Sequence, residues 1–319
     1  LRYSLIVGLL TLVSYLMFFL SGLAFGLIDQ NRSSIDHWKA DTVLLSSEAN
    51  RTLALSNLKL SDKSSLSADI VEPFSQMVTV AKTEKNSNDD VKQKVSIFGV
   101  NDGSFLIPPI IEGRSFEAEN EVVIEKSLSE KEGFSIGDTI KTANSDTELK
   151  IVGYTEKSRF NAVPVIYINI NDFQTLKYGA NKATDNPMIN AFVVKGELKD
   201  YDSSVFQKVS VGNFINELPG YVLTIQKTPI FGIMKAQGIS NKTIGSAVLS
   251  QTFILSLIGS ILGLLGTWLT SLVLPPAVPF LGNGLYYSII FVSLIVFSLV
   301  GTLFSVLAIR KIDPLKAIG

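Results

Sequence analysis

Three long runs of the chain contain only uncharged, mostly apolar residues. They cover residues 5–27, 244–274 and 285–309. The hydrocarbon core of a bilayer is about 30 Å thick, and a helix needs about 20 apolar residues to cross it. The pattern therefore predicts three membrane-spanning helices. A stretch rich in proline and glycine, residues 275–284, separates the last two runs, so we expect these two helices to form a hairpin.

The first run has a second interpretation, because Arg2 precedes it as in a secretory signal peptide. The apolar core of a signal peptide is about 7–15 residues long and ends at a small-residue cleavage site. The run from Leu5 to Leu27 is 23 residues long and has no clean cleavage site at its end. We therefore expect it to remain as a span.

Residues 28–220 are polar and carry shorter patterns. Polar residues 82–94 predict a mobile loop, and a Gly-Asp turn is expected at Gly133–Asp138. Runs rich in β-branched residues predict strands at Glu121–Glu125, Thr139–Thr142, Leu149–Tyr154, Val163–Ile170 and Met188–Val194. Short helices are expected at Ser127–Glu132 and Asn171–Tyr178, the second capped by Asn171. This mixture predicts an α+β domain set between membrane helices.

Charge is divided unevenly between these parts. The whole chain has a net charge of −1, but residues 28–220 hold 21 of the 28 basic and 28 of the 29 acidic residues. The apolar frame keeps seven basic residues and one acid, Asp313. Cytoplasmic loops of membrane proteins are enriched in Lys and Arg. The N-terminus, residues 222–245 and residues 310–319 are therefore expected inside, and residues 28–220 outside.

This sidedness requires four membrane crossings, but the sequence has three apolar runs. The conflict lies at Leu218–Tyr221, where the acidic domain meets the lysine-bearing segment directly. One hypothesis is that a span of about 20–30 residues is missing from the chain at this junction. The alternative is a genuine three-span protein with a weak charge bias.

The residue inventory excludes several kinds of chemistry. The chain has no cysteine and a single histidine, His37, so neither a disulfide framework nor a multi-histidine metal centre can form within it. No glycine-rich phosphate loop with Lys and Ser/Thr is present, so this chain is not expected to hydrolyse ATP. We expect no catalytic residues and no metal, and the charge balance argues against nucleic acid as a partner.

The segment from Lys227 to Gly238 reads KTPIFGIMKAQG, and the tail from Ile312 reads IDPLKAIG. Together with the strand, helix and Gly-Asp pattern of residues 121–154, these segments resemble the FtsX-like, MacB-type ABC transporter permeases. The resemblance implies a multi-pass permease in the cell membrane, with four spans and one large extracellular domain. It also implies a homodimer, surrounded by membrane lipid, that works with two copies of a separate ABC ATPase holding ATP and Mg²⁺. The coupling residues toward that ATPase would be Phe231, Gly232, Met234, Lys235 and Gly238.

Residues 21–27, SGLAFGL, and 31–35, NRSSI, are most similar to the haem-exporter permeases of Gram-positive bacteria. Haem needs apolar walls, aromatic stacking and axial ligands. The candidate substrate residues are Met17, Phe18, Phe25 and Arg32, with Phe19 and His37 as further candidates. The alternative is that the aromatic residues only pack or face lipid, and that His37 is a surface residue.

The predicted organisation has five parts: a first membrane helix (1–27), an extracellular domain (28–220), a coupling segment (221–245), a helical hairpin (246–309) and a tail (310–319). The pairs Gly22/Gly26 and Gly259/Gly263 allow close helix approach, within one subunit or across a dimer. The expected function is ATP-driven export, with haem as the leading substrate. The alternatives are a mechanotransmission permease that regulates a cell-wall hydrolase, and an exporter of lipids or peptides.

Overall fold

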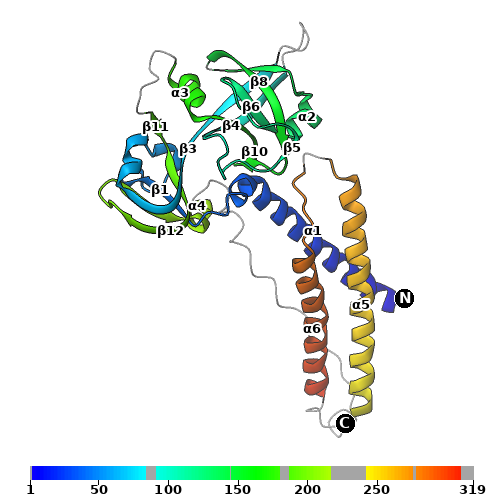
Figure 1. Cartoon of the computed structure of the whole chain (residues 1–319). Helices are drawn as coiled ribbons and strands as arrows, with labels where there is room; N and C mark the ends of the chain where they lie inside the picture. Colours follow the sequence, from blue (N-terminus) through cyan, green and yellow to red (C-terminus); the bar gives the residue numbers. More distant parts are fainter. Residues whose placement is uncertain are drawn as a thin grey trace. The chain divides into compact units, whose positions relative to one another are not determined.

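The computed structural model describes residues 2–83, 91–143, 145–179, 187–216, 242–275 and 278–309. The chain forms two compact units, which are treated separately here (Figure 1). The helical unit comprises Leu1–Leu27 and Lys227–Gly319, and the β-rich unit comprises Ile28–Gln226.

Three helices of the described residues are long and apolar enough to cross a membrane. They are α1 (Arg2–Asp36), α5 (Lys242–Val273) and α6 (Gly284–Ile309). Their most apolar windows have mean hydropathies of 2.2, 1.9 and 2.1. At a rise of 1.5 Å per residue even the shortest, α6, is about 39 Å long, which exceeds the hydrocarbon thickness. The three predicted helices are thereby confirmed, and α5 and α6 run side by side (Figure 1).

Helix α1 does not end where its apolar run ends. It continues to Asp36, nine residues beyond Leu27. Residues 28–36 contain neither glycine nor proline, so no residue in this stretch breaks the helix. The last turns of α1 therefore belong to the β-rich unit.

The β-rich unit is built on one eleven-stranded mixed sheet and one two-stranded sheet. The main path of the large sheet runs β13-β1-β12-β3-β4-β10-β6-β8-β5, with β7 and β9 paired beside it. The pairs β10–β4 and β6–β8 are parallel, and the other pairs are antiparallel. The strands of the large sheet are β1 (Thr42–Ser46), β3 (Leu66–Thr83), β4 (Val91–Val100), β5 (Ile110–Gly113), β6 (Glu121–Glu125), β7 (Thr139–Thr142), β8 (Ser145–Thr155), β9 (Arg159–Phe160), β10 (Val163–Asn169), β12 (Ala191–Tyr201) and β13 (Phe206–Ser210).

The remaining elements of this unit are short. Strands β2 (Leu58–Lys59) and β11 (Met188–Ile189) form the small sheet. The helices are α2 (Ser127–Glu132), α3 (Ile170–Tyr178) and α4 (Val211–Asn216), and the 3-10 turns are η1 (Ser47–Ala49), η2 (Leu53–Leu55) and η3 (Leu60–Ser65). These elements confirm the predicted α+β domain.

One long strand connects the two halves of the large sheet. The first half of β3, from Leu66 to Phe74, pairs with β12, and its second half, from Ser75 to Thr83, pairs with β4. Both halves thus share one continuous strand.

Neighbouring residues on the central strands alternate between two apolar cores. Phe98 and Tyr167 join the core around Trp38, whereas Ile97 and Ile166 join the second core. Successive side chains of a strand point to opposite faces, so both faces of these strands are covered. Trp38 is fully buried, with ring centroids 5.0 Å from Phe74 and 6.4 Å from Phe214. It directly follows the end of α1 and His37, so it fastens this end of the helix into the domain.

Most of the predicted elements of this unit are confirmed, and three details are wrong. β6, β7 and α2 have the predicted bounds, whereas the predicted strand 188–194 divides into β11 and β12. Of the predicted loop 82–94, residues 82–83 and 91–94 belong to the paired strands β3 and β4, and residues 84–90 lie outside the described residues. Helix α3 is capped by Asn169, whose side chain accepts a hydrogen bond from the Asn171 backbone N–H. Asn171 itself lies inside the first turn because the chain enters the helix one residue earlier.

Candidate functional site

The predicted glycine pair on α5 lies against α1. A β-carbon placed on Gly259 would lie 2.6 Å from the Leu10 Cβ, and one on Gly263 would lie 2.5 Å from the Ser14 Cβ. Both distances are shorter than any real carbon contact, so only glycine allows this separation of the helices. Close approach through small residues replaces the hydrophobic effect as the source of helix association in lipid.

The glycine pair on α1 serves the connection between α5 and α6. A β-carbon on Gly22 would lie 2.4 Å from the Phe280 ring, and one on Gly26 would lie 2.3 Å from the Pro279 carbonyl oxygen. The Leu281 N–H donates to the Gly22 carbonyl over 2.9 Å. Of the two roles expected for these pairs, the structure shows close approach within one chain.

Two of the predicted substrate residues, Phe18 and Phe25, pack against α6. Phe18 is fully buried, with its ring centroid 5.4 Å from that of Tyr287, and Phe25 lies 4.6 Å from Tyr286. Met17 instead stays 39% exposed on another side of α1. The helical unit thus brings Phe18 and Phe25 into one aromatic cluster with α6 and leaves Met17 outside it.

A groove of about 550 Å³ borders this cluster. Its size falls within the range of sites that bind small molecules, about 300–1,000 Å³. It is lined by Leu264, Leu265, Thr267, Trp268, Ser271, Phe280, Gly282 and Tyr287. The Tyr287 hydroxyl is buried without a hydrogen-bond partner among the described residues. No sequence motif indicated these residues as a site, although Trp and Tyr near the end of a span are typical of the membrane interface.

Arg32, the fourth predicted substrate residue, already has an acidic partner. Its guanidinium donates to both carboxylate oxygens of Asp36, one turn further along α1, over 2.6–2.9 Å. The two side chains are 32% and 43% exposed, so water screens the pair. A carboxylate of a ligand would compete with Asp36 for this guanidinium. His37 is half-buried between Asp36 and the fully buried Trp38.

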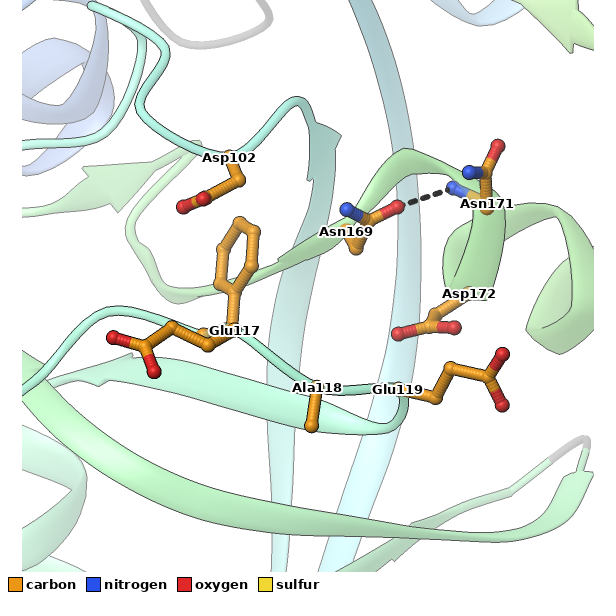
Figure 2. Close-up of a pocket in the computed structure, with 8 residues that line it drawn as sticks. Asp102, Glu117, Ala118, Glu119, Asn169, Asn171 and Asp172 are labelled. Carbon is orange, nitrogen blue, oxygen red and sulfur yellow. Dashed lines mark hydrogen bonds between the residues drawn. The ribbon is translucent and has the colours of Figure 1, made fainter.

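The β-rich unit contains an acidic pocket of about 190 Å³ (Figure 2). It lies where β10 leads into α3, and its lining includes four carboxylates, two amides and the Phe116 ring. Burial raises the pKa of the Asp172 carboxyl, and the nearby Glu119 adds to this effect. The residues that line the pocket are Asp102, Phe116, Glu117, Ala118, Glu119, Asn169, Asn171 and Asp172. Within the part of the chain that the structure describes, no three His, Cys, Asp or Glu side chains are placed so that they could hold one metal ion.

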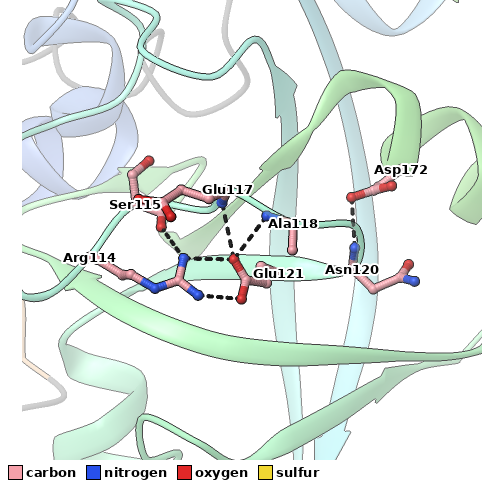
Figure 3. A network of polar contacts seen from close by, with 7 residues as sticks. All are labelled: Arg114, Ser115, Glu117, Ala118, Asn120, Glu121 and Asp172. Carbon is pink, nitrogen blue, oxygen red and sulfur yellow. Dashed lines mark hydrogen bonds and ion pairs between the residues drawn. The ribbon is translucent and has the colours of Figure 1, made fainter.

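Beside this pocket an ion pair fixes the start of β6 (Figure 3). The Arg114 guanidinium donates through both terminal nitrogens to Glu121, one of them over 2.7 Å. The Glu121 carboxylate also accepts the backbone N–H groups of Glu117 and Ala118, over 3.0 and 3.1 Å. The guanidinium and these N–H groups lower the pKa of Glu121 to about 2. This network holds the loop that borders the acidic pocket.

The predicted coupling residues lie outside the described residues. Phe231, Gly232, Met234, Lys235 and Gly238 all fall between Asn216, where α4 ends, and Lys242, where α5 begins. Their contact with an ATPase remains a prediction.

Long apolar helices on either side of a large α+β domain define a multi-pass membrane protein with an extracellular or periplasmic core domain. Residues 7–204 match the MacB-like periplasmic core domain family, and residues 221–314 match the FtsX-like permease C-terminal family. The chain therefore belongs to the FtsX/MacB-type ABC transporter permeases. Such permeases carry no ATPase of their own, which implies a separate ABC ATPase as the partner.

Curated relatives match the whole chain. A protein of Staphylococcus haemolyticus is 26% identical over 345 residues, which cover 100% of this chain and 95% of the relative. A protein of Staphylococcus epidermidis is 27% identical over 343 residues with the same coverage. Both are named HrtB, the permease protein of a hemin transport system.

Solved structures show lower similarity. The extracellular domain of the ABC-type transporter YknZ from Gram-positive bacteria has 15% identity and a TM-score of 0.36, covering 50% of this chain and 84% of that one. The periplasmic region of MacB from Actinobacillus actinomycetemcomitans has 14% identity and a TM-score of 0.40, covering 60% and 94%.

Proposed function

We propose that this chain is the membrane subunit of an ATP-driven exporter and that haem is its substrate. The observation that carries the proposal is the full-length match to two permeases named for hemin transport.

The chemistry of the helical unit supports a flat, apolar substrate. Phe18 and Phe25 form an aromatic cluster with α6, and the neighbouring groove adds Trp268 and Tyr287. Aromatic faces bind a planar apolar ring through stacking and area burial. Met17 is exposed and offers a thioether, whereas Arg32 can reach a propionate only when its pair with Asp36 opens.

The exporter is proposed to act as a homodimer with two ATPase subunits. The coupling residues named above, Phe231 to Gly238, would contact the ATPase on the cytoplasmic side. That placement requires a fourth crossing before the coupling segment. The alignment with the S. haemolyticus relative is 345 positions long, 26 more than the 319 residues of this chain, so the relative has residues that this chain lacks.

Transport can be measured in inside-out membrane vesicles that contain this chain and its partner ATPase. We expect ATP-dependent accumulation of haem, reduced several-fold by Lys235→Glu in the coupling segment. Lys208→Glu, a change on the edge strand β13, is the matched control and should transport like the unchanged protein. No ATP-dependent haem movement in the unchanged protein would refute haem export. Unchanged haem tolerance of cells lacking the chain, with altered cell separation, would favour mechanotransmission instead.

Sidedness can be tested separately because the chain has no cysteine of its own. A single Ser240→Cys change introduces one thiol next to the coupling segment. We expect it to resist a membrane-impermeant thiol reagent in intact cells and to react after permeabilisation. Labelling of intact cells would place the segment outside, where no ATPase could bind it.

A further inference from the structure

The last turns of α1 are held by the turn that carries β9, and both belong to the β-rich unit. The Ser33 hydroxyl accepts the Arg159 N–H over 3.0 Å, and the Ser34 hydroxyl donates to the Arg159 carbonyl over 2.9 Å. Two serines of the helix thus bind both backbone groups of one residue. We call residues 157–162 the α1 clamp.

Two further hydrogen bonds come from the other side of the clamp. The Asn161 N–H donates to the Asn31 carbonyl over 3.1 Å, and the Ala162 N–H donates to the Gln30 carbonyl over 3.0 Å. At 100° per residue, positions 30, 31, 33 and 34 lie within one half of the helix circumference. Four directional bonds on one side of a helix resist its rotation about its own axis.

The clamp keeps a backbone conformation that side chains disfavour. Lys157, Asn161 and Ala162 have φ angles of 48°, 50° and 63°. Residues with a β-carbon rarely adopt this left-handed region, and such strain persists only where surrounding contacts enforce it. For Asn161 and Ala162 these contacts are the bonds to α1 and the bond from the Arg159 guanidinium to the Ala162 carbonyl, 3.3 Å long.

Arg159 also connects the clamp to the central sheet. Its guanidinium donates to the Ser127 hydroxyl over 2.8 Å, and Ser127 in turn bonds the carboxylate of Glu125 at the end of β6. Glu125 is 6% exposed. Beneath these polar contacts, Ile35 and Trp38 are buried in the first core. The clamp thus restricts rotation of the end of α1, and burial of Ile35 and Trp38 holds this end against the core.

We propose that the α1 clamp is the joint through which displacement of α1 is delivered to the central sheet, with Arg159 as its positioning residue. This inference rests on the proposed function, because only an ATP-driven permease would displace α1. The proposal assigns a mechanical role to Ser33 and Ser34. A helix end that only packed against the domain would not need their hydrogen bonds.

The test uses the full chain with its partner ATPase and the double variant Ser33→Ala/Ser34→Ala. Two lost hydrogen bonds predict roughly tenfold faster amide hydrogen exchange across residues 159–162. Haem export should fall several-fold while ATP hydrolysis is retained, and Ser33→Thr/Ser34→Thr, which keeps both hydroxyls, should restore it. The control is Ser64→Ala, since its exposed hydroxyl donates to the carbonyl of the nearby Ser61, over 2.9 Å, and lies away from α1 in sequence. Normal export by the double alanine variant, despite faster exchange, would overturn the proposal.

A second measurement separates the joint from the transported substrate. An environment-sensitive label on a single Leu55→Cys, at a position 66% exposed, reports movement of the domain when ATP is added. An ATP-dependent change that disappears in the double alanine variant supports the joint even if the unchanged protein exports no haem. An equal change in both proteins refutes the joint while leaving export intact.

Discussion

Gly8 and Gly263 should respond in opposite ways to the same substitution, alanine. Both lie inside membrane helices, where glycine is less favourable than alanine by about 1 kcal/mol. A β-carbon on Gly8 meets nothing within 4 Å, so Gly8→Ala should stabilise the helical unit by up to that amount. The pair therefore separates helix propensity from helix packing.

At Gly263 the new methyl group has no room. It would lie 2.5 Å from the Ser14 Cβ and 2.7 Å from the Tyr15 backbone nitrogen. Neither atom is the end of a flexible side chain, so α1 and α5 must move apart. Overpacking typically costs about 1–3 kcal/mol. Separation also stretches the hydrogen bonds of Thr267 and Thr270 to the Tyr15 carbonyl and hydroxyl, 3.3 and 3.1 Å long. We expect Gly263→Ala to destabilise the helical unit by about 2 kcal/mol, after its gain in helix propensity is subtracted.

The assay is the fraction of protein that remains monodisperse after heating in detergent, compared among the unchanged chain, Gly8→Ala and Gly263→Ala. Ser14→Gly added to Gly263→Ala removes the nearest clashing atom and should recover part of the loss. The recovery is only partial because the Tyr15 nitrogen remains. If Gly263→Ala proves as stable as Gly8→Ala, the close approach of α1 and α5 is incorrect.

Three further predictions concern the β-rich unit. Trp38→Ala should destabilise this unit by about 3–5 kcal/mol, because removal of a fully buried indole leaves a large cavity. The loss can be measured from the midpoint of chemical denaturation. A loss below about 1 kcal/mol would contradict the central position of Trp38 in the core. Glu121 has a folded-state pKa of about 2 against an ordinary 4.5, so its contribution to stability is present above pH 4.5 and is lost as the pH falls toward 2. Glu121→Gln should flatten the acid limb of the stability profile, and an unchanged limb would show that the Arg114 pair is not formed. Asn169→Ala should lower the stability of the unit by about 0.5–2 kcal/mol because it removes the α3 cap, whereas Asn171→Ala should have little effect. Thermal unfolding of the two variants measures the difference. A larger loss for Asn171→Ala than for Asn169→Ala would show that Asn171 is the cap.

The elements that the sequence predicted best are those whose signal is local. The three apolar helices follow from run length alone, and β6, β7 and α2 follow from short patterns bounded by turn residues. The α3 cap was missed by two residues because two asparagines adjoin the helix start and both are suitable caps. The strands at 82–83 and 91–94 were missed because lysines face outward there while Ala81 and Val95 are fully buried. One buried face is enough to hold a strand, and overall polarity hides it.

For the candidate sites the division is similar. The sequence nominated Phe18 and Phe25 as aromatic residues near the end of a span, but only the structure shows that Tyr287 packs against Phe18 and that Trp268 lines the groove with Tyr287. It nominated Arg32 as a substrate residue, yet the helix places Asp36 one turn away, where the two charges pair.

By itself the sequence determined that the chain is a membrane protein with an acidic outside domain, because run length and charge are properties of single segments. The resemblance to the permease family likewise rests on motifs within single segments. Only the tertiary structure decided which elements pack against the two glycine pairs, where the aromatic groove lies and how the turn with β9 binds α1. The glycine contacts and the contacts of β9 with α1 join residues more than 100 positions apart, such as Ser34 and Arg159, and no local pattern encodes a contact between distant segments.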